Sequence, residues 1–220
     1  MKRIFTSLIN RGMTLIELLV SIAIFTIITS VVLFNHTEFN SNVLVTNLAY
    51  EVALAIRQAQ TYGLSVKQGS THSFGIYVDT NGPQSLIIFE DTNNDGIFNG
   101  TGNFDEVCPS VSSGDADGDT CEERLSLRGN VEFSEFCVYK EINGLRCSVG
   151  SDNINWSSVM FKRPNPIALI YGEQFGPNTD NLDLNKDTQK YFTITLKSNS
   201  TDKHKTVKVE RTGQISVVQE

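Results

Sequence analysis

The sequence from Met13 to Phe34 reads MTLIELLVSIAIFTIITSVVLF, and the organisation of the rest of the chain follows from this stretch. It contains one charged residue, Glu17, among apolar and small hydroxyl side chains. Its length of about 22 residues matches the roughly 20 residues that a helix needs to cross the hydrocarbon core of a bilayer. The stretch is therefore predicted to form a transmembrane helix.

A polar leader, residues 1–12, precedes the apolar stretch and contains the basic residues Lys2, Arg3 and Arg11. A secretory signal peptide is cut behind its apolar region, at a site of small residues. Polar and charged residues follow the stretch here instead. The alternative is a cut in front of the stretch, between Gly12 and Met13, which would leave the helix on the mature protein.

The segment RGMTLIE, residues 11–17, resembles the class III signal of type IV prepilins and type II secretion pseudopilins. In that family a membrane peptidase cuts after the glycine and methylates the new N-terminus. The resemblance therefore implies cleavage after Gly12 and methylation of Met13. It also implies partners: other pilin or pseudopilin subunits, the prepilin peptidase and an inner-membrane assembly platform.

The carboxylate of Glu17 has a physical interpretation of its own. A charged side chain inside a membrane segment costs several kcal/mol unless it is paired, so it is a candidate functional residue. After cleavage, Glu17 would lie one helical turn from the new α-amine of Met13, and pairing with such an amine would offset the cost. In the family this pairing guides subunits into a filament. The alternative is an interfacial glutamate at the start of an ordinary anchor.

Composition restricts the location and the partners of the chain. Its 220 residues have a net charge of −7, which argues against a general nucleic-acid binder, so nucleic acid is not an expected partner. The basic leader places the N-terminus in the cytoplasm by the positive-inside rule, with the C-terminal part periplasmic or extracellular. The expected protein crosses the inner, or cytoplasmic, membrane once and contacts membrane lipid through its helix.

The helix is predicted to continue beyond the membrane. Residues 35–62 contain neither glycine nor proline, and their apolar residues recur at spacings of three and four, which defines one stripe on a helix. The stripe consists of Val45, Leu48, Val52, Ile56 and Ala59. We therefore expect a cleaved leader over 1–12, one helix over 13–62 with its transmembrane part at 13–34, and a globular domain over 63–220 that begins at Gly63.

The rest of the chain shows the pattern of strands and turns. Ser73–Val78 and Leu86–Phe89 flank an Asn-Gly turn and predict a hairpin. Glu123–Leu127 and Val131–Tyr139, on either side of Arg128-Gly129-Asn130, suggest a second hairpin. Further strands are predicted at Val159–Lys162, Ile167–Tyr171, Tyr191–Leu196, Thr206–Glu210 and Ile215–Val218. The fold class is therefore α+β and pilin-like: a long N-terminal helix packed on a mainly antiparallel β domain.

The β-rich tail also resembles the GspH/FimT-like minor pseudopilins. The resemblance rests on an Asp-rich turn after a hydrophobic strand, residues 87–96, and on a closing strand, Gly turn and strand, residues 205–217. It implies a minor subunit of a type II secretion or type IV pilus filament. Two alternatives remain: a membrane-anchored extracellular domain that binds calcium or another ligand without polymerising, and a DNA-uptake minor pilin.

Four cysteines lie in the predicted extracytoplasmic part: Cys108, Cys121, Cys137 and Cys147. An even number of cysteines in an exported chain favours disulfides. Of the three possible connectivities we favour the two short loops, Cys108–Cys121 and Cys137–Cys147. A zinc site is the weaker alternative, because the sequence has no Cys-x-x-Cys pair and its histidines are scattered.

One segment has the spacing of a calcium-binding loop, and calcium is the one candidate cofactor. Oxygen donors at alternate positions and a glycine for the sharp turn fit the first nine places of an EF-hand loop. These donors are Asp91, Asn93, Asp95, the carbonyl of Ile97 and Asn99. The twelfth place is Gly102, where the pattern requires a bidentate glutamate. The alternative is an Asn/Asp-rich turn between strands.

Two other groups of charged residues are predicted to face solvent. A second acidic stretch contains Asp115, Asp117 and Asp119, and is predicted to be a solvated loop. A basic concentration at the C-terminal end contains Lys203, Lys205, Lys208 and Arg211, and is predicted to be a solvated strand face rather than a DNA contact. The sequence shows no phosphate-binding glycine loop and no hydrolase or metalloprotease motif, so neither a catalytic residue nor an enzymatic activity is expected.

Overall fold

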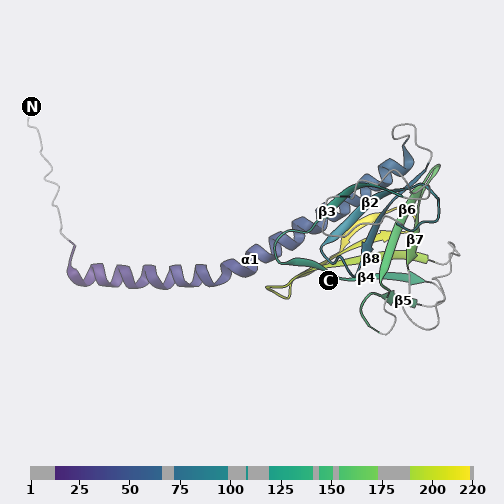
Figure 1. Cartoon of the computed structure of the whole chain (residues 1–220). Helices are drawn as coiled ribbons and strands as arrows, with labels where there is room; N and C mark the ends of the chain where they lie inside the picture. Colours follow the sequence, from purple (N-terminus) through teal and green to yellow (C-terminus); the bar gives the residue numbers. More distant parts are fainter. Residues whose placement is uncertain are drawn as a thin grey trace, which may run out of the picture. The chain divides into compact units, whose positions relative to one another are not determined.

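The computed structural model of the chain describes residues 13–65, 72–98, 108, 119–140, 144–150, 154–172 and 189–218 (Figure 1). The chain divides into two units, Met1–Asn40 and Ser41–Glu220. One helix, α1 (Leu15–Leu64), contributes to both units, and all the strands of the described residues belong to the second unit.

The part of α1 that belongs to the second unit is amphipathic, as its sequence predicts. The five residues of the predicted stripe are at most 1% exposed, which confirms the helical period of the pattern. Tyr50 and Leu54 lie on the opposite side of the helix and are exposed. The stripe is therefore the surface through which this part of the helix packs on the rest of its unit.

Ten strands lie in the described residues. Their bounds are β1 (Ser73–Asp79), β2 (Ser85–Asp91), β3 (Thr120–Ser126), β4 (Val131–Lys140), β5 (Gly144–Cys147), β6 (Trp156–Lys162), β7 (Asn165–Gly172), β8 (Gln189–Ser198), β9 (His204–Glu210) and β10 (Ile215–Val218). They form two five-stranded antiparallel sheets. The first sheet has the order β3-β2-β1-β6-β7, and the second has the order β10-β9-β8-β4-β5. The α+β class with a mainly antiparallel domain is confirmed.

A single apolar core joins the helix stripe to one face of each sheet. Ile76 of β1, Phe161 of β6 and Ile194 of β8 are fully buried in it together with the helix residues. Because side chains alternate between the faces of a strand, the neighbouring residues of the first sheet point away from this core. They form a second apolar cluster on what we call the outer face of the first sheet. The buried members of this cluster are Tyr77, Ile87, Phe89, Met160 and Tyr171.

The predicted hairpin of β1 and β2 is confirmed, but the predicted hairpin of β3 and β4 is wrong. β3 pairs with β2 in the first sheet, whereas β4 pairs with β8 in the second. The segment between them crosses from one sheet to the other, and the Leu127 N–H donates a hydrogen bond of 2.7 Å to the Gln84 carbonyl. The turn residues at 128–130 therefore serve a change of sheet, because each flanking strand has a longer-range partner.

The sequence pattern does not predict strand β5. Its four residues, Gly-Leu-Arg-Cys, include one aliphatic residue, so no alternation is visible. The strand exists because it pairs with β4, where Cys147 lies opposite Cys137. Pairing with a neighbour, rather than local propensity, determines its conformation.

Gly63 lies inside the last turn of α1, which continues to Leu64. A Cβ atom built on Gly63 would lie 2.3 Å from the carbonyl oxygen of Phe161 in β6. This distance is too short for any side chain. The glycine therefore permits the close approach of the helix and β6.

We expect Gly63→Ala to lower the free energy of unfolding by about 1–3 kcal/mol, because the added methyl group pushes the helix and β6 apart. At an open position in a helix the same substitution would stabilise by up to about 1 kcal/mol, so the sign of the change is informative. Thermal unfolding of the full chain in detergent micelles, followed by circular dichroism, measures it. A stability that is unchanged or raised would contradict the close packing at Gly63.

Candidate functional site

The N-terminal end of α1 combines two features that the sequence singled out. Met13 and Glu17 are described and exposed, whereas Gly12 lies outside the described residues. The N–H of Glu17 donates a hydrogen bond of 3.3 Å to Oγ1 of Thr14, which is the contact of an N-cap residue. Thr14 and Glu17 have the spacing of a capping box, so Glu17 has a local structural role to be separated from any role in assembly.

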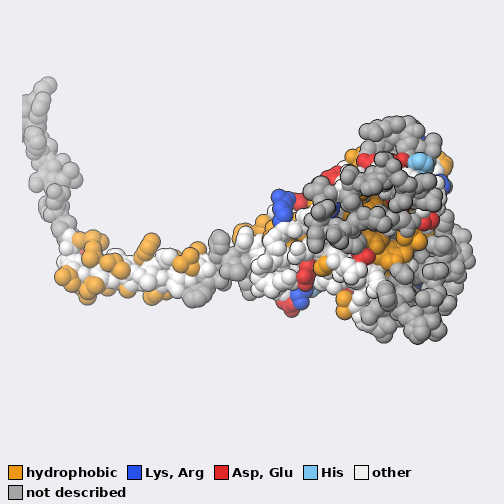
Figure 2. Space-filling model, viewed as in Figure 1, with side chains coloured by type: hydrophobic (Ala, Val, Ile, Leu, Met, Phe, Trp, Pro, Cys, Tyr) orange, Lys and Arg blue, Asp and Glu red, His pale blue; other side chains and the backbone are white. Residues whose placement is uncertain are grey.

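The segment Leu15–Leu33 is long and apolar enough to cross a membrane, and none of it is buried inside the structure. Figure 2 shows hydrophobic side chains exposed along this part of the helix. Among the helices that the structure describes, it is the one segment with this length and composition. Glu17 is the single charged residue of the segment. The segment thus has the properties that the sequence predicts for a membrane anchor.

A second candidate site lies in the β domain, where three carboxylates come together. One oxygen atom each of Asp91, Asp95 and Asp119 lies within 4.8 Å of the other two. Asp91 and Asp119 are buried and Asp95 is half-buried. We call this group the acidic cluster.

Strand pairing brings two members of the acidic cluster together. Asp91 is the last residue of β2, and Asp119 directly precedes β3. Glu90 lies opposite Thr120 in the antiparallel pair, so the next step of the ladder places Asp91 opposite Asp119. Like charges directly opposite each other on two strands destabilise the pair. The pairing of β2 with β3 therefore brings two acidic side chains close together.

The third member, Asp95, comes from the turn that follows β2, residues 92–98. Asn94 and Gly96 adopt positive φ angles of 61° and 78°, which folds the turn back. The Gly96 carbonyl accepts a short hydrogen bond from Oγ of Ser158, and a Cβ at Gly96 would lie 2.4 Å from the ring of Tyr171. The turn is thus held close to the outer face of the first sheet.

The carboxylate of Asp91 is only partly satisfied. Its Oδ2 atom accepts a hydrogen bond of 3.1 Å from the N–H of Gly96, but its buried Oδ1 atom has no hydrogen-bond partner among the described residues. Burial raises the pKa of Asp91, although backbone N–H groups, that of Gly96 first, oppose the rise. Burial, and then the charges of Asp91 and Asp95, raise the pKa of Tyr171 to about 12.

The cluster differs from the predicted calcium loop in its composition. Asp91 and Asp95 lie together, but Oδ1 of Asn93 accepts a hydrogen bond of 3.0 Å from the N–H of Asp95, and Nδ2 of Asn93 donates to Oδ2 of Asp95. The N–H of Ile97 donates a hydrogen bond of 2.7 Å to Oδ1 of Asp95. Asn99 lies outside the described residues. The asparagine and the isoleucine therefore hold the turn in shape around Asp95.

Sequence reasoning missed Asp119 as a member of this site. The sequence predicts a separate, solvated acidic loop for this residue, but Asp119 is 1% exposed, and its Oδ1 atom accepts a hydrogen bond of 3.0 Å from the N–H of Thr92. The solvated-loop prediction is thus wrong for Asp119, while Asp115 and Asp117 lie outside the described residues. The signal that could have found it is the strand pairing of β2 with β3.

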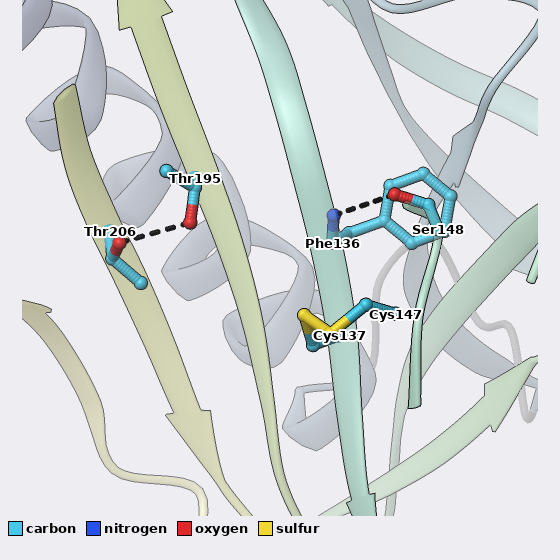
Figure 3. The surroundings of a disulfide bond; sticks show 6 residues. All are labelled: Phe136, Cys137, Cys147, Ser148, Thr195 and Thr206. Atoms are coloured by element: carbon cyan, nitrogen blue, oxygen red, sulfur yellow. Dashed lines mark hydrogen bonds between the residues drawn. A yellow bond between two sulfur atoms is a disulfide. The ribbon is translucent and has the colours of Figure 1, made fainter. Parts of the chain in front are cut away.

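The cysteines are joined in the two short loops that the sequence favours. Disulfides connect Cys108 with Cys121 and Cys137 with Cys147. Figure 3 shows the second disulfide across β4 and β5, next to the hydrogen bond of 3.0 Å from the N–H of Phe136 to Oγ of Ser148. With all four cysteines in disulfides, their thiolates are not available as zinc ligands.

One of the basic residues near the C-terminal end, Lys208, is partly neutralised by its neighbours. Nζ of Lys208 donates a hydrogen bond of 2.8 Å to Oε1 of Glu210 and lies 4.6 Å from the ring centroid of Tyr191. Lys197 and Asp202 form an ion pair of 2.8 Å nearby in the sequence. The contacts of Lys208 agree with a solvated strand face, which stays a prediction for the group as a whole.

The comparison with protein families points to the N-terminal segment. Residues 9–33 match the family model described as the prokaryotic N-terminal methylation motif. Together with the apolar helix, this match supports a type IV pilin-like prepilin signal at the N-terminal end of the chain. Such a motif implies processing by prepilin peptidase, anchoring through the N-terminal helix and assembly with other pilin-type subunits. No curated protein and no solved structure matches the chain.

Proposed function

We propose that the chain is a minor pilin or pseudopilin, a subunit of a type II secretion or type IV pilus filament. In this proposal prepilin peptidase cuts after Gly12 and methylates Met13. The apolar part of α1 first anchors the subunit in the inner membrane, with the N-terminus in the cytoplasm. It then joins the helices of other subunits in the filament, guided by the pairing of Glu17 with an N-terminal amine.

One observation carries the proposal: the methylation motif coincides with an apolar helix that has a single carboxylate in its first turn. The motif covers residues 9–33, and the candidate membrane span Leu15–Leu33 lies inside it. An ordinary anchor has no need of a carboxylate there, because an unpaired charge in lipid costs several kcal/mol. The agreement of motif, helix and charge therefore supports a filament subunit over a passive anchor.

The assignment to a minor, GspH/FimT-like subunit is supported by the β domain. Major type IV pilins usually carry one C-terminal disulfide loop. In this chain the second disulfide instead joins β4 and β5 in the middle of the domain. The ten strands of the described residues also exceed the simple sheet expected of a major pseudopilin.

The intact mass of the protein, purified from membranes of cells that contain prepilin peptidase, tests the proposal. We expect the mass of residues 13–220 plus one methyl group, because the peptidase removes the leader and methylates Met13. Gly12→Val is the control variant and should keep its leader, since the peptidase cuts after glycine. A native chain that retains its leader in these cells would contradict the proposal.

A further inference from the structure

We propose that the acidic cluster of Asp91, Asp95 and Asp119 is a binding site for one calcium ion on the outer face of the first sheet. The site is independent of filament assembly, since it rests on contacts within the β domain. It also differs from a contiguous calcium loop. The third carboxylate comes from the start of β3, where a loop of the EF-hand type would supply a glutamate from its own twelfth position.

The spacing of the carboxylates fits a single calcium ion. Calcium binds oxygen ligands at about 2.3–2.6 Å, so two ligands of one ion are at most about 5.2 Å apart. One oxygen atom of each aspartate lies within 4.8 Å of the corresponding atoms of the other two, which is inside this limit. One ion can therefore contact all three side chains with little movement of the backbone.

A second, independent observation is the unsatisfied carboxylate oxygen of Asp91. Its side chain is 2% exposed, yet Oδ1 has no hydrogen-bond partner among the described residues. Buried carboxylate oxygens are normally satisfied by a donor or a cation, because an unpaired one loses its hydration without compensation. The opposed position of Asp119 adds a repulsion that a cation would turn into an attraction.

The chemistry of the donor atoms indicates which cation this site would bind. All three side chains offer hard carboxylate oxygens, which suit calcium, magnesium or manganese rather than zinc or copper. Magnesium requires near-ideal octahedral geometry and keeps several waters, whereas calcium accepts irregular sets of six to eight ligands. Asp91 and Asp119 are buried and Asp95 belongs to a turn, so the set is irregular and only partly open to water. This arrangement favours calcium.

An ion in this position would connect three parts of the chain. It would join the end of β2, the turn of residues 92–98 and the start of β3, just before the disulfide of Cys121 with Cys108. The turn already contacts β1 and β6, since Asn94 Oδ1 accepts hydrogen bonds from Ser73 Oγ and Lys162 Nζ. Calcium would thus fix the turn from the side of β3 as well and stabilise the folded domain.

Direct binding is measured by titrating the full chain, in detergent micelles and freed of metal with a chelator, with calcium chloride in a calorimeter. We expect one calcium ion per chain and at least tenfold weaker binding of magnesium chloride. Asp91→Asn and Asp119→Asn should each remove calcium binding. The control Asp202→Asn removes the same charge from an exposed ion pair with Lys197, outside the cluster, and should bind calcium as the native chain does.

Thermal unfolding gives a second readout that also shows whether each variant is folded. Calcium at ten times its dissociation constant should raise the melting temperature of the native chain by about 3–6 °C. Without metal, Asp91→Asn should melt at or above the native temperature, because it removes one of two opposed charges, yet gain nothing from calcium. Absence of calcium binding at millimolar concentration, binding retained in both cluster variants, or a preference for magnesium would overturn the proposal.

Discussion

Glu17→Gln is expected to leave cleavage after Gly12 intact and to remove the subunit from filaments. Under the proposed function the carboxylate pairs with a neighbouring N-terminal amine within lipid. Loss of one partner from a buried ion pair costs about 3–5 kcal/mol, because the other charge is left unpaired. A cost of 3 kcal/mol corresponds to association that is on the order of a hundredfold weaker. The ratio of filament-bound to membrane-bound subunit, with the intact mass of the membrane form, measures both steps.

The choice of glutamine separates assembly from helix capping. Thr14 accepts a hydrogen bond from the N–H of Glu17, and a capping box accepts glutamine as well as glutamate at this position. Glu17→Gln therefore keeps the cap and removes the charge, whereas Thr14→Ala weakens the cap and keeps the charge. We expect Thr14→Ala to assemble. If Glu17→Gln assembled normally, the chain would be better described as a membrane-anchored domain that does not polymerise.

Local patterns in the sequence were sufficient for the helix and for most strands. The stripe of α1 could be predicted because its spacing of three and four residues reflects the geometry of a single helix. Strands such as β8 and β9 could be predicted for the same reason, since alternation of apolar and polar residues is a local property. In these elements the pattern of buried and exposed residues can be recognised within a window of a few residues.

The parts that could not be predicted depend on pairing between distant segments. β5 has no alternation of its own and forms only as the partner of β4. β3 and β4 look like a hairpin because turn residues separate them, yet each strand pairs elsewhere. Asp119 enters the acidic cluster for the same reason, because only the pairing of β3 with β2 places it opposite Asp91. The sequence therefore indicates Asp91 and Asp95 as members of the candidate calcium site, but not Asp119.

The pilin-like signal can be recognised more completely from the sequence than the acidic cluster. A prepilin signal is read by a peptidase as a short segment, so its residues must be adjacent in the sequence. A metal site needs only that its ligands meet in space, so the folded chain can collect them from a strand end, a turn and a strand start. This difference explains why the family comparison matches residues 9–33, while the site in the β domain emerges from the structure.

Leu48→Ala is expected to lower the free energy of unfolding of the β domain by about 2–5 kcal/mol, because it leaves a cavity in the core shared by α1 and the two sheets. Leu48 is 1% exposed and belongs to the buried stripe of the helix. A change of this size would lower the melting temperature by roughly 5–20 °C for a domain of this length. Thermal unfolding of the full chain in detergent micelles measures it.

Leu54→Ala is the matched control for Leu48→Ala, since it removes the same atoms from the same helix. Leu54 is 62% exposed, so its truncation opens no cavity and should change the free energy of unfolding by at most about 0.5 kcal/mol. The two leucines have nearly equal helix propensity costs on replacement, so the difference between the variants reports burial alone. Equal losses in both variants would contradict the packing of this helix face on the sheets, and with it the arrangement that holds the β domain on the helix.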